Sequence, residues 1–120
     1  MTATLYARLG NVEGITRLVS DVVDAHLNNP LVQPRFANVK DLEHAKRMSV
    51  EFFCAGSGGP QTYTGRDMLA THQGMNISEQ EFLAVVDDIM GAMDKNNVGE
   101  AEKKDVLAIL YSLKGQIIRV

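Results

Sequence analysis

The sequence predicts an all-α fold, and three observations support this. Apolar residues recur at three- and four-residue steps along nearly all of the chain, which is the spacing that places them on one face of a helix. No stretch alternates apolar and polar residues with the period of two that is typical of strands. Groups of proline, glycine and asparagine interrupt the pattern where helices would end. With 120 residues and no internal repeat, residues 1–120 have the length of one domain.

The N-terminal part of the chain predicts two helices. A short helix covers about residues 3–9 and ends at Gly10. Asn11 is a candidate N-cap for the second helix, whose apolar stripe continues to Leu27. The second helix ends at Asn28-Asn29-Pro30, because proline cannot continue the helical hydrogen bonds and restricts the residue before it.

The middle of the chain predicts a turn, a third helix and a loop. The turn covers Leu31 to Phe36, and Asp41 can cap a helix that runs to about Cys54. The stretch Gly56-Ser57-Gly58-Gly59-Pro60-Gln61 has the composition of a loop.

The C-terminal part predicts a short helix and two longer ones. The short helix carries His72 and ends at Gly74, a residue suited to a left-handed backbone. Ser78-Glu79-Gln80-Glu81 is a capping box that opens a long helix. Asn96-Asn97-Val98-Gly99 ends that helix, and a last helix carries apolar residues from Val106 to Ile117.

Composition narrows the class of protein. Cys54 is the only cysteine, which excludes an internal disulfide and fits a reducing cytoplasm. The N-terminus shows no secretory signal pattern, and no apolar run approaches the ~20 residues that span a bilayer. The net charge of −3, with scattered Lys and Arg, argues against nucleic acid as a partner. Zinc-ligand spacings and phosphate-binding glycine motifs are missing from the sequence.

His72 is the leading candidate for a functional side chain. Its neighbours Met68 and Met75 stand at the three- and four-residue steps that put all three on one helix face. A neutral imidazole nitrogen on an apolar face is a suitable ligand for haem iron. The alternative is a structural histidine that only makes hydrogen bonds.

Short motifs in a fixed order surround this histidine. Together they resemble the truncated haemoglobins, the shortened two-over-two globins, and group I of that family above all. A generic helical bundle is the alternative, but it has no need of the roughly ten loop residues before the His72 helix. The matching motifs and residues are Leu5-Tyr6-Ala7-Arg8-Leu9-Gly10, Phe36, Val50-Glu51-Phe52-Phe53, Gly58-Gly59-Pro60, Tyr63-Thr64-Gly65-Arg66, Met68, His72-Gln73-Gly74, Ile77 and Phe82.

The resemblance implies a truncated globin fold, a two-over-two helical sandwich around haem b, with His72 as the iron ligand. Phe36 would lie against the porphyrin face. Tyr63 and Arg66 would lie near the haem propionates, where an arginine can pair with a carboxylate; a solvated surface arginine is the alternative. For the apolar residues, ordinary core packing is the alternative. The remaining residues expected along the haem slot are Leu42, Phe53, Met68, Ile77, Phe82 and Val85.

The chain departs from the family on the side of the haem where gas would bind. The family usually has a Phe-Tyr pair where this chain has Val22-Val23, and often a glutamine where it has Ser49. One turn before Ser49 stands Ala45. Dioxygen takes up partial negative charge when it binds, so a hydrogen-bond donor stabilises it by ~1.5–3 kcal/mol, whereas carbon monoxide gains little. We therefore expect a small-sided, largely apolar distal pocket that retains dioxygen weakly.

Met48, His26 and His44 are the other residues that could reach iron. Met48 lies at the margin of the haem-facing side of its helix, and its thioether could become a sixth ligand; flexible packing is the alternative. His26 lies close to the inner stripe of its helix, where a role in the core or in an interhelical hydrogen bond is expected. His44 is expected to face solvent.

The leading functional hypothesis is therefore a haem protein that reversibly binds oxygen, nitric oxide or carbon monoxide, for storage, transport, sensing or detoxification. It would be a cytoplasmic monomer with an unidentified reductase or electron donor. No catalytic residue is assigned. One alternative is a nitric oxide dioxygenase or a peroxidase-like haem enzyme. The other is a haem-free helical interaction module, since a fold does not fix a function.

Overall fold

The computed structural model describes residues 3–120 and is built of helices joined by turns and one longer loop. The all-α prediction is confirmed. The one β-type contact among the described residues is an isolated bridge between Ile77 and Ile118. The elements in chain order are α1 (Leu5–Arg8), α2 (Asn11–Leu27), the 3-10 turn η1 (Gln33–Arg35), α3 (Leu42–Gly56), α4 (Met68–His72), α5 (Glu79–Lys95), α6 (Glu100–Ser112) and the 3-10 turn η2 (Lys114–Gln116).

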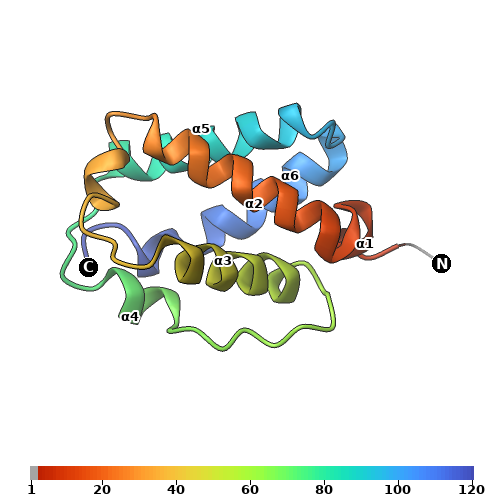
Figure 1. The fold of residues 1–120 in the computed structure, drawn as a ribbon, viewed down its shortest axis with the longest axis horizontal. Coiled ribbons are helices and arrows are strands. Elements are labelled where there is room, and N and C mark those ends of the chain that lie inside the picture. The colour runs from red at the N-terminus through yellow and green to blue at the C-terminus, as the bar shows by residue number, and fades with distance from the viewer. Residues whose placement is uncertain (1–2) are drawn as a thin grey trace.

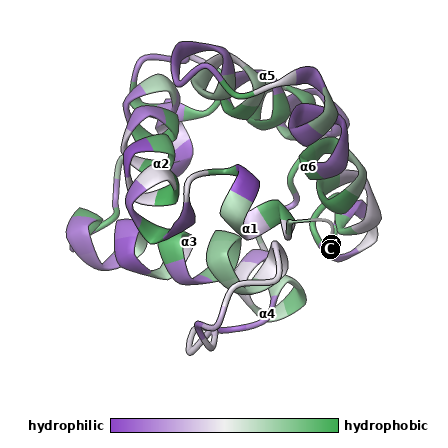
Figure 2. Cartoon of the chain, turned by 90° about the vertical axis from the view of Figure 1, so that its right-hand side faces the viewer, coloured by the Kyte–Doolittle hydropathy of each residue, from purple (hydrophilic) through white to green (hydrophobic). Residues whose placement is uncertain are grey.

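Four helices form two layers (Figure 1). Helix α2 packs against both α3 and α5, and α5 also packs against α6. Seen end-on, α2 and α3 occupy one side and α5 and α6 the other, with the short α4 below them (Figure 2). Two long helices thus lie over two others, and α4 lies beside them, in contact with η2.

The core lies where α2, α3 and α5 meet. Helix α2 buries one stripe of apolar side chains, as its three- and four-residue spacing predicts. The largest side chains that are fully shielded from solvent come from all three helices: Ile15, Leu18, Val19, Cys54 and Met93. Burial raises the pKa of the Cys54 thiol and keeps it in the less reactive, protonated form.

The entry to α2 corrects one sequence prediction. Asn11 does not cap the helix: Gly10 stands at the cap position with φ +97°, and Asn11 is the first helical residue. The chain enters α2 so closely that a Cβ on Gly14 would lie 2.3 Å from the carbonyl oxygen of Leu9. A left-handed Gly10 and a side-chain-free Gly14 make this tight turn possible.

The end of the last helix also differs from the prediction, which extended it to Ile117. Helix α6 ends at Ser112, whose hydroxyl donates to the carbonyl of Ile109 at 2.6 Å. The chain then turns and pairs with the segment after His72. The amide of Arg119 donates to the carbonyl of Ile77 at 2.9 Å, and the amide of Gly74 donates to the carbonyl of Val120 at 3.1 Å. A continued helix could not make these bonds.

The predicted glycine after the His72 helix and the predicted capping box of α5 are confirmed. Gly74 follows α4 with φ +88°, and Ser78 and Glu81 form the reciprocal capping box at the start of α5. Helix α4 itself is short, because it ends at His72 and Met75 falls outside it. Met68, His72 and Met75 therefore do not share one helix, contrary to the prediction.

Candidate functional site

A cavity of about 370 Å³ lies between the end of α2, the turn before α3, α4 and the first half of α5. That volume falls within the range of cofactor and ligand sites. Most of its lining is apolar, and it comes from segments spread between His26 and Ile117. The lining residues are His26, Leu31, Val32, Arg35, Phe36, Val39, Thr71, His72, Met75, Ile77, Glu81, Phe82, Val85, Val86, Leu110 and Ile117.

His72 reaches this cavity from the last position of α4. The helix starts at Asp67, whose carboxylate accepts from the amide of Ala70 at 2.7 Å. Nδ1 of His72 lies 2.8 Å from the carbonyl oxygen of Met68. A carbonyl can only accept, so Nδ1 carries the proton and Nε2 of the neutral ring keeps its lone pair. A half-buried imidazole with this tautomer is the donor that a haem iron requires.

A second imidazole lines the same cavity. His26, near the end of α2, is only 7% exposed, and its Nδ1 lies 2.7 Å from Oδ2 of Asp88 on α5. The side-chain amide of Asn29 donates to both carboxylate oxygens of Asp88, at 3.1 and 3.2 Å. The imidazole also stacks on the ring of Phe36, with 5.6 Å between centroids and 24° between planes. The interhelical hydrogen bond predicted for His26 is confirmed.

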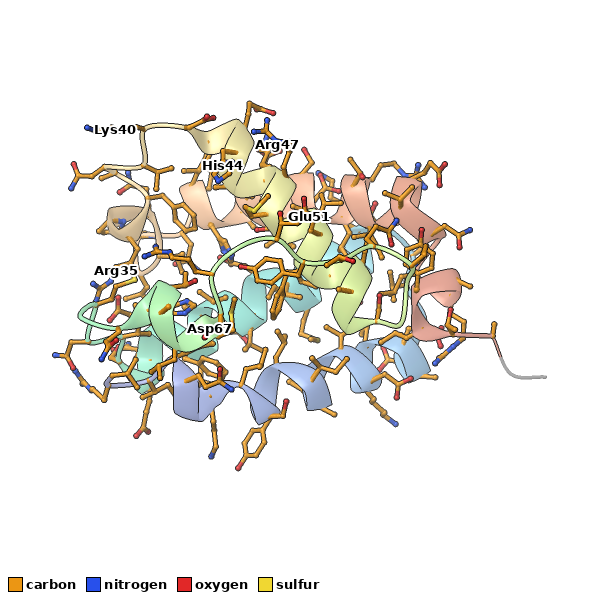
Figure 3. All side chains as sticks on the ribbon, turned by 90° about the horizontal axis from the view of Figure 1, so that it is seen from below. Arg35, Lys40, His44, Arg47, Glu51 and Asp67 are labelled. Atoms are coloured by element: carbon orange, nitrogen blue, oxygen red, sulfur yellow. The ribbon has the colours of Figure 1, made fainter. Side chains whose placement is uncertain are left out.

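An ion pair between Arg35 and Glu81 borders the cavity. Nε and Nη2 of Arg35 donate to the two oxygens of Glu81 at 2.5 and 2.9 Å, and Nη1 donates to the carbonyl of Met75 at 2.9 Å. The guanidinium and the amide of Ser78 lower the pKa of Glu81 to about 2. Arg35 therefore joins three segments, those that carry Phe36, Met75 and the start of α5. Figure 3 labels Arg35 at the end of the molecule where α4 lies.

The sequence predicts thirteen residues around the haem, and the structure brings five of them together. Phe36, His72, Ile77, Phe82 and Val85 line the cavity.

The other eight predicted residues do not line this cavity. Leu42 and Phe53 pack against the core cluster. On α3, the residues Ala45, Met48 and Ser49 are half-buried. Met68 is half-buried and Arg66 is exposed, while the hydroxyl of Tyr63 donates to the carbonyl of Arg66 at 2.6 Å. Their contacts with haem stay predictions.

Several sequence motifs meet one another in space. The amide of Tyr6 donates to the carbonyl of Ser57 at 2.9 Å, and a Cβ on Gly59 would lie 2.6 Å from the ring of Tyr6. One Glu51 oxygen accepts from both the amide and the hydroxyl of Thr64, at 2.8 and 2.7 Å, which lowers the pKa of Glu51. The long loop before α4 is thereby attached to α1 and α3.

Sequence reasoning missed part of the cavity wall. Leu31, Val32 and Val39 line it although they lie outside the helices, where the helical spacing gives no guidance. Arg35 and Glu81 are 46 residues apart, so their pairing has no local signal. His26 had one: it follows Val22 and Val23 by four and three residues, within the buried stripe of α2.

Comparison with known proteins identifies the family. The sequence profile of the bacterial-like globins matches residues 4–119. The chain belongs to this globin family. A group 1 truncated hemoglobin GlbN from a Nostoc species is 28% identical, over 97% of this chain and 98% of its own. Another from Mycolicibacterium paratuberculosis is also 28% identical, over 96% of this chain and 84% of its own.

Solved structures support the same fold. The truncated hemoglobin from Tetrahymena pyriformis superposes with a TM-score of 0.94 at 22% identity, covering 98% of this globin and all of that chain. A group II truncated hemoglobin from Bacillus anthracis gives 0.88 at 22% identity, over 100% and 94%. The two-over-two globin fold is thus confirmed. The similarity to group I, predicted from the motifs, is confirmed by the sequence relatives rather than by the fold.

Membership of the globin family implies haem and a gas ligand, and the residues present fit a haem. An imidazole with a free Nε2 lone pair opens on an apolar cavity whose wall includes Phe36 and Phe82. Over residues 3–120, no helix of this globin is long and apolar enough to cross a membrane.

Proposed function

We propose that residues 1–120 form one domain that binds haem b through Nε2 of His72 and reversibly binds a diatomic gas. One observation carries the proposal: Nδ1 of His72 is committed to the carbonyl of Met68 at 2.8 Å, while the ring lines the apolar cavity. Hydrogen bonding at Nδ1 both fixes the ring orientation and makes Nε2 a stronger ligand.

The cavity side chains would hold the flat cofactor by apolar contact. Phe36, Ile77, Phe82 and Val85 supply the surface, and each 100 Å² of apolar area removed from water contributes about 2.5 kcal/mol. Bound haem supplies the iron that binds the gas. His72 orients it, and the apolar wall excludes water from it.

The α3 residues and the loop would complete the site when haem is present. We propose that Leu42, Ala45, Met48, Ser49 and Phe53 face the cofactor from α3, as they do by family resemblance. Met68 would lie on the His72 side, and Tyr63 and Arg66 near the propionates. The hydroxyl of Tyr63 is already used by Arg66, so the guanidinium of Arg66 is the free propionate partner of the two.

The gas site would be poor in hydrogen-bond donors. Val22 and Val23 are 6% and 5% exposed and belong to the core cluster, and neither side chain can donate. Dioxygen would therefore dissociate faster than from a pocket with a tyrosine at this position. Gas binding needs ferrous iron, so an electron donor or reductase is part of the proposal.

A haem titration tests the proposal. The purified chain should take up one equivalent of haem and show a Soret band that shifts when carbon monoxide is added to the reduced protein. A His72→Ala variant should lose the histidine-ligated spectrum, and added imidazole should restore it. His44→Ala is the matched control, because His44 is an exposed imidazole on α3 (Figure 3). If His72→Ala keeps the parent spectrum, the assignment of His72 is wrong.

Thermal melting separates this proposal from a haem-free interaction module. A ligand that binds only the folded chain adds stability as RT ln(1 + [L]/Kd), about 2.7 kcal/mol at a hundredfold excess over Kd. We expect haem to raise the melting temperature of the parent protein. No rise at saturating haem would contradict haem binding and favour the interaction module.

A further inference from the structure

The polar side chains of the cavity are almost all committed to hydrogen bonds. The three nitrogens of Arg35 donate to Glu81 and Met75. The hydroxyl of Thr71 bonds to the carbonyl of Asp67 at 2.8 Å. Among the described side chains of the lining, two polar atoms have no hydrogen-bond partner, Nε2 of His72 and Nε2 of His26. The proposed function uses the first and leaves the second.

Asp88 determines whether Nε2 of His26 carries a proton or a lone pair. A carboxylate only accepts, so Nδ1 of His26 donates to Oδ2 of Asp88, and Nε2 of the neutral ring carries a lone pair. The ring cannot easily turn over, since it is 93% shielded and stacked on Phe36. Asn29 donates to both oxygens of Asp88 and holds the carboxylate in place.

We propose that His26 is a specificity-determining residue of the gas site, an inference that rests on the proposed function. Its Nε2 faces the bound gas as a hydrogen-bond acceptor, and Asp88 sets that polarity. A lone pair repels a gas that takes up partial negative charge, as dioxygen does, and is tolerated by nearly non-polar carbon monoxide. The site therefore discriminates against dioxygen, beyond the mere lack of a donor at Val22 and Val23.

The pair offers a substitution that reverses the polarity. In Asp88→Asn, the amide oxygen would stay toward the donating group of Asn29, because two amide NH2 groups cannot bond to each other. The new NH2 would then face Nδ1 of His26, move the proton to Nε2 and make Nε2 a donor. The same exchange of an aspartate for an asparagine inverts the histidine tautomer in serine proteases.

Four proteins test the proposal: the parent, His26→Leu, Asp88→Asn and the double variant. The infrared stretching frequency of bound carbon monoxide reports the local field, since an acceptor nearby raises it and a donor lowers it. We expect the parent to be highest, His26→Leu lower and Asp88→Asn lowest, with the double variant equal to His26→Leu. Dioxygen affinity should follow the reverse order, with Asp88→Asn about tenfold or more above the parent.

A measurement on the unmodified protein stands beside the variants. Nitrogen NMR of the carbon monoxide complex, labelled in histidine, should show His26 protonated at Nδ1; protonation at Nε2 would overturn the proposal. Equal frequencies in the haem-loaded parent and His26→Leu would also overturn it. So would an Asp88→Asn shift that persists when His26 is leucine. A parent protein that takes up no haem removes the proposed function together with this inference.

Discussion

The α2–α5 wall of the cavity and the α4 wall are held in different ways. The first consists of two 17-residue helices that pack along the core and are joined by the His26–Asp88 bond. The second is a five-residue helix with no buried residue. It is held by the Met75–Arg35 bond, the Gly74–Val120 bond and the contacts with η2.

This difference separates stability from ligand binding. Long amphipathic helices gain most of their stability from tertiary packing, whereas a helix of one turn is marginal by itself. The α2–α5 wall should therefore persist without haem, and the α4 wall should gain its full stability only when the cofactor fills the cavity. The iron ligand would thus stand on the part of the molecule that can adjust.

Removing core volume from the α2–α5 wall should have the largest effect. Met93 is 0% exposed, so Met93→Ala leaves a cavity and should lower the free energy of unfolding by about 2–5 kcal/mol. Leu83 is the control on the same helix, because it is 60% exposed and its replacement by alanine should cost less than about 0.5 kcal/mol. Urea unfolding measures both. Equal losses would show that α5 is not packed as described.

The Arg35–Glu81 pair links the two walls, and its loss should have an intermediate effect. The pKa of Glu81 is lowered from 4.5 to about 2, so its contribution is fully present above about pH 4.5 and is lost as the pH falls toward 2. Glu81→Gln should cost about 1–2 kcal/mol at neutral pH, a value reduced for solvent screening because the Arg35 side chain is 33% exposed.

The pH dependence distinguishes this pair from general packing. The difference between the parent and Glu81→Gln should shrink when unfolding is measured at about pH 3 instead of pH 7. Glu79→Gln is the control, because Glu79 stands two residues earlier and is exposed. It should change the free energy of unfolding little at either pH. A difference that stays constant with pH would mean that the ion pair is not its cause.

A change at the end of α4 should lower stability no more than the loss of the ion pair does, and it should have a clear effect on haem binding. Gly74 has φ +88° and open space around it, so Gly74→Ala strains only the backbone, by about 1–2 kcal/mol. Gly115→Ala, also in open space and without a left-handed backbone, is the control. We expect Gly74→Ala, but not Gly115→Ala, to speed the loss of haem. The rate is measured as the transfer of haem to an acceptor protein. Equal rates for the two variants would contradict a role for the turn after His72.

Local signals in the sequence predicted much of this architecture. The helix breaks at Pro30 and Gly74 and the capping box at Ser78 act within one turn of the chain, so they could be recognised without the fold. The end of α6 could not, because it depends on the pairing of Arg119 with Ile77, which is a long-range contact.

The same distinction applies to the candidate site. The place of His72 in the cavity could be predicted because the sequence motifs around it are local. The partners of His26 and Arg35 lie 62 and 46 residues away, and nothing in the spacing pairs them. Val39 lines the cavity from outside the helices, where no periodicity exists to be recognised.

Hydrogen exchange of backbone amides, with and without haem, tests the contrast between the two walls most directly. The account predicts strong protection in α2 and α5 in both states, and protection of residues 68–77 that rises markedly only when haem is bound. If the amides of α4 are as protected as those of α5 without haem, or if haem leaves their exchange unchanged, the two walls do not differ in the way proposed.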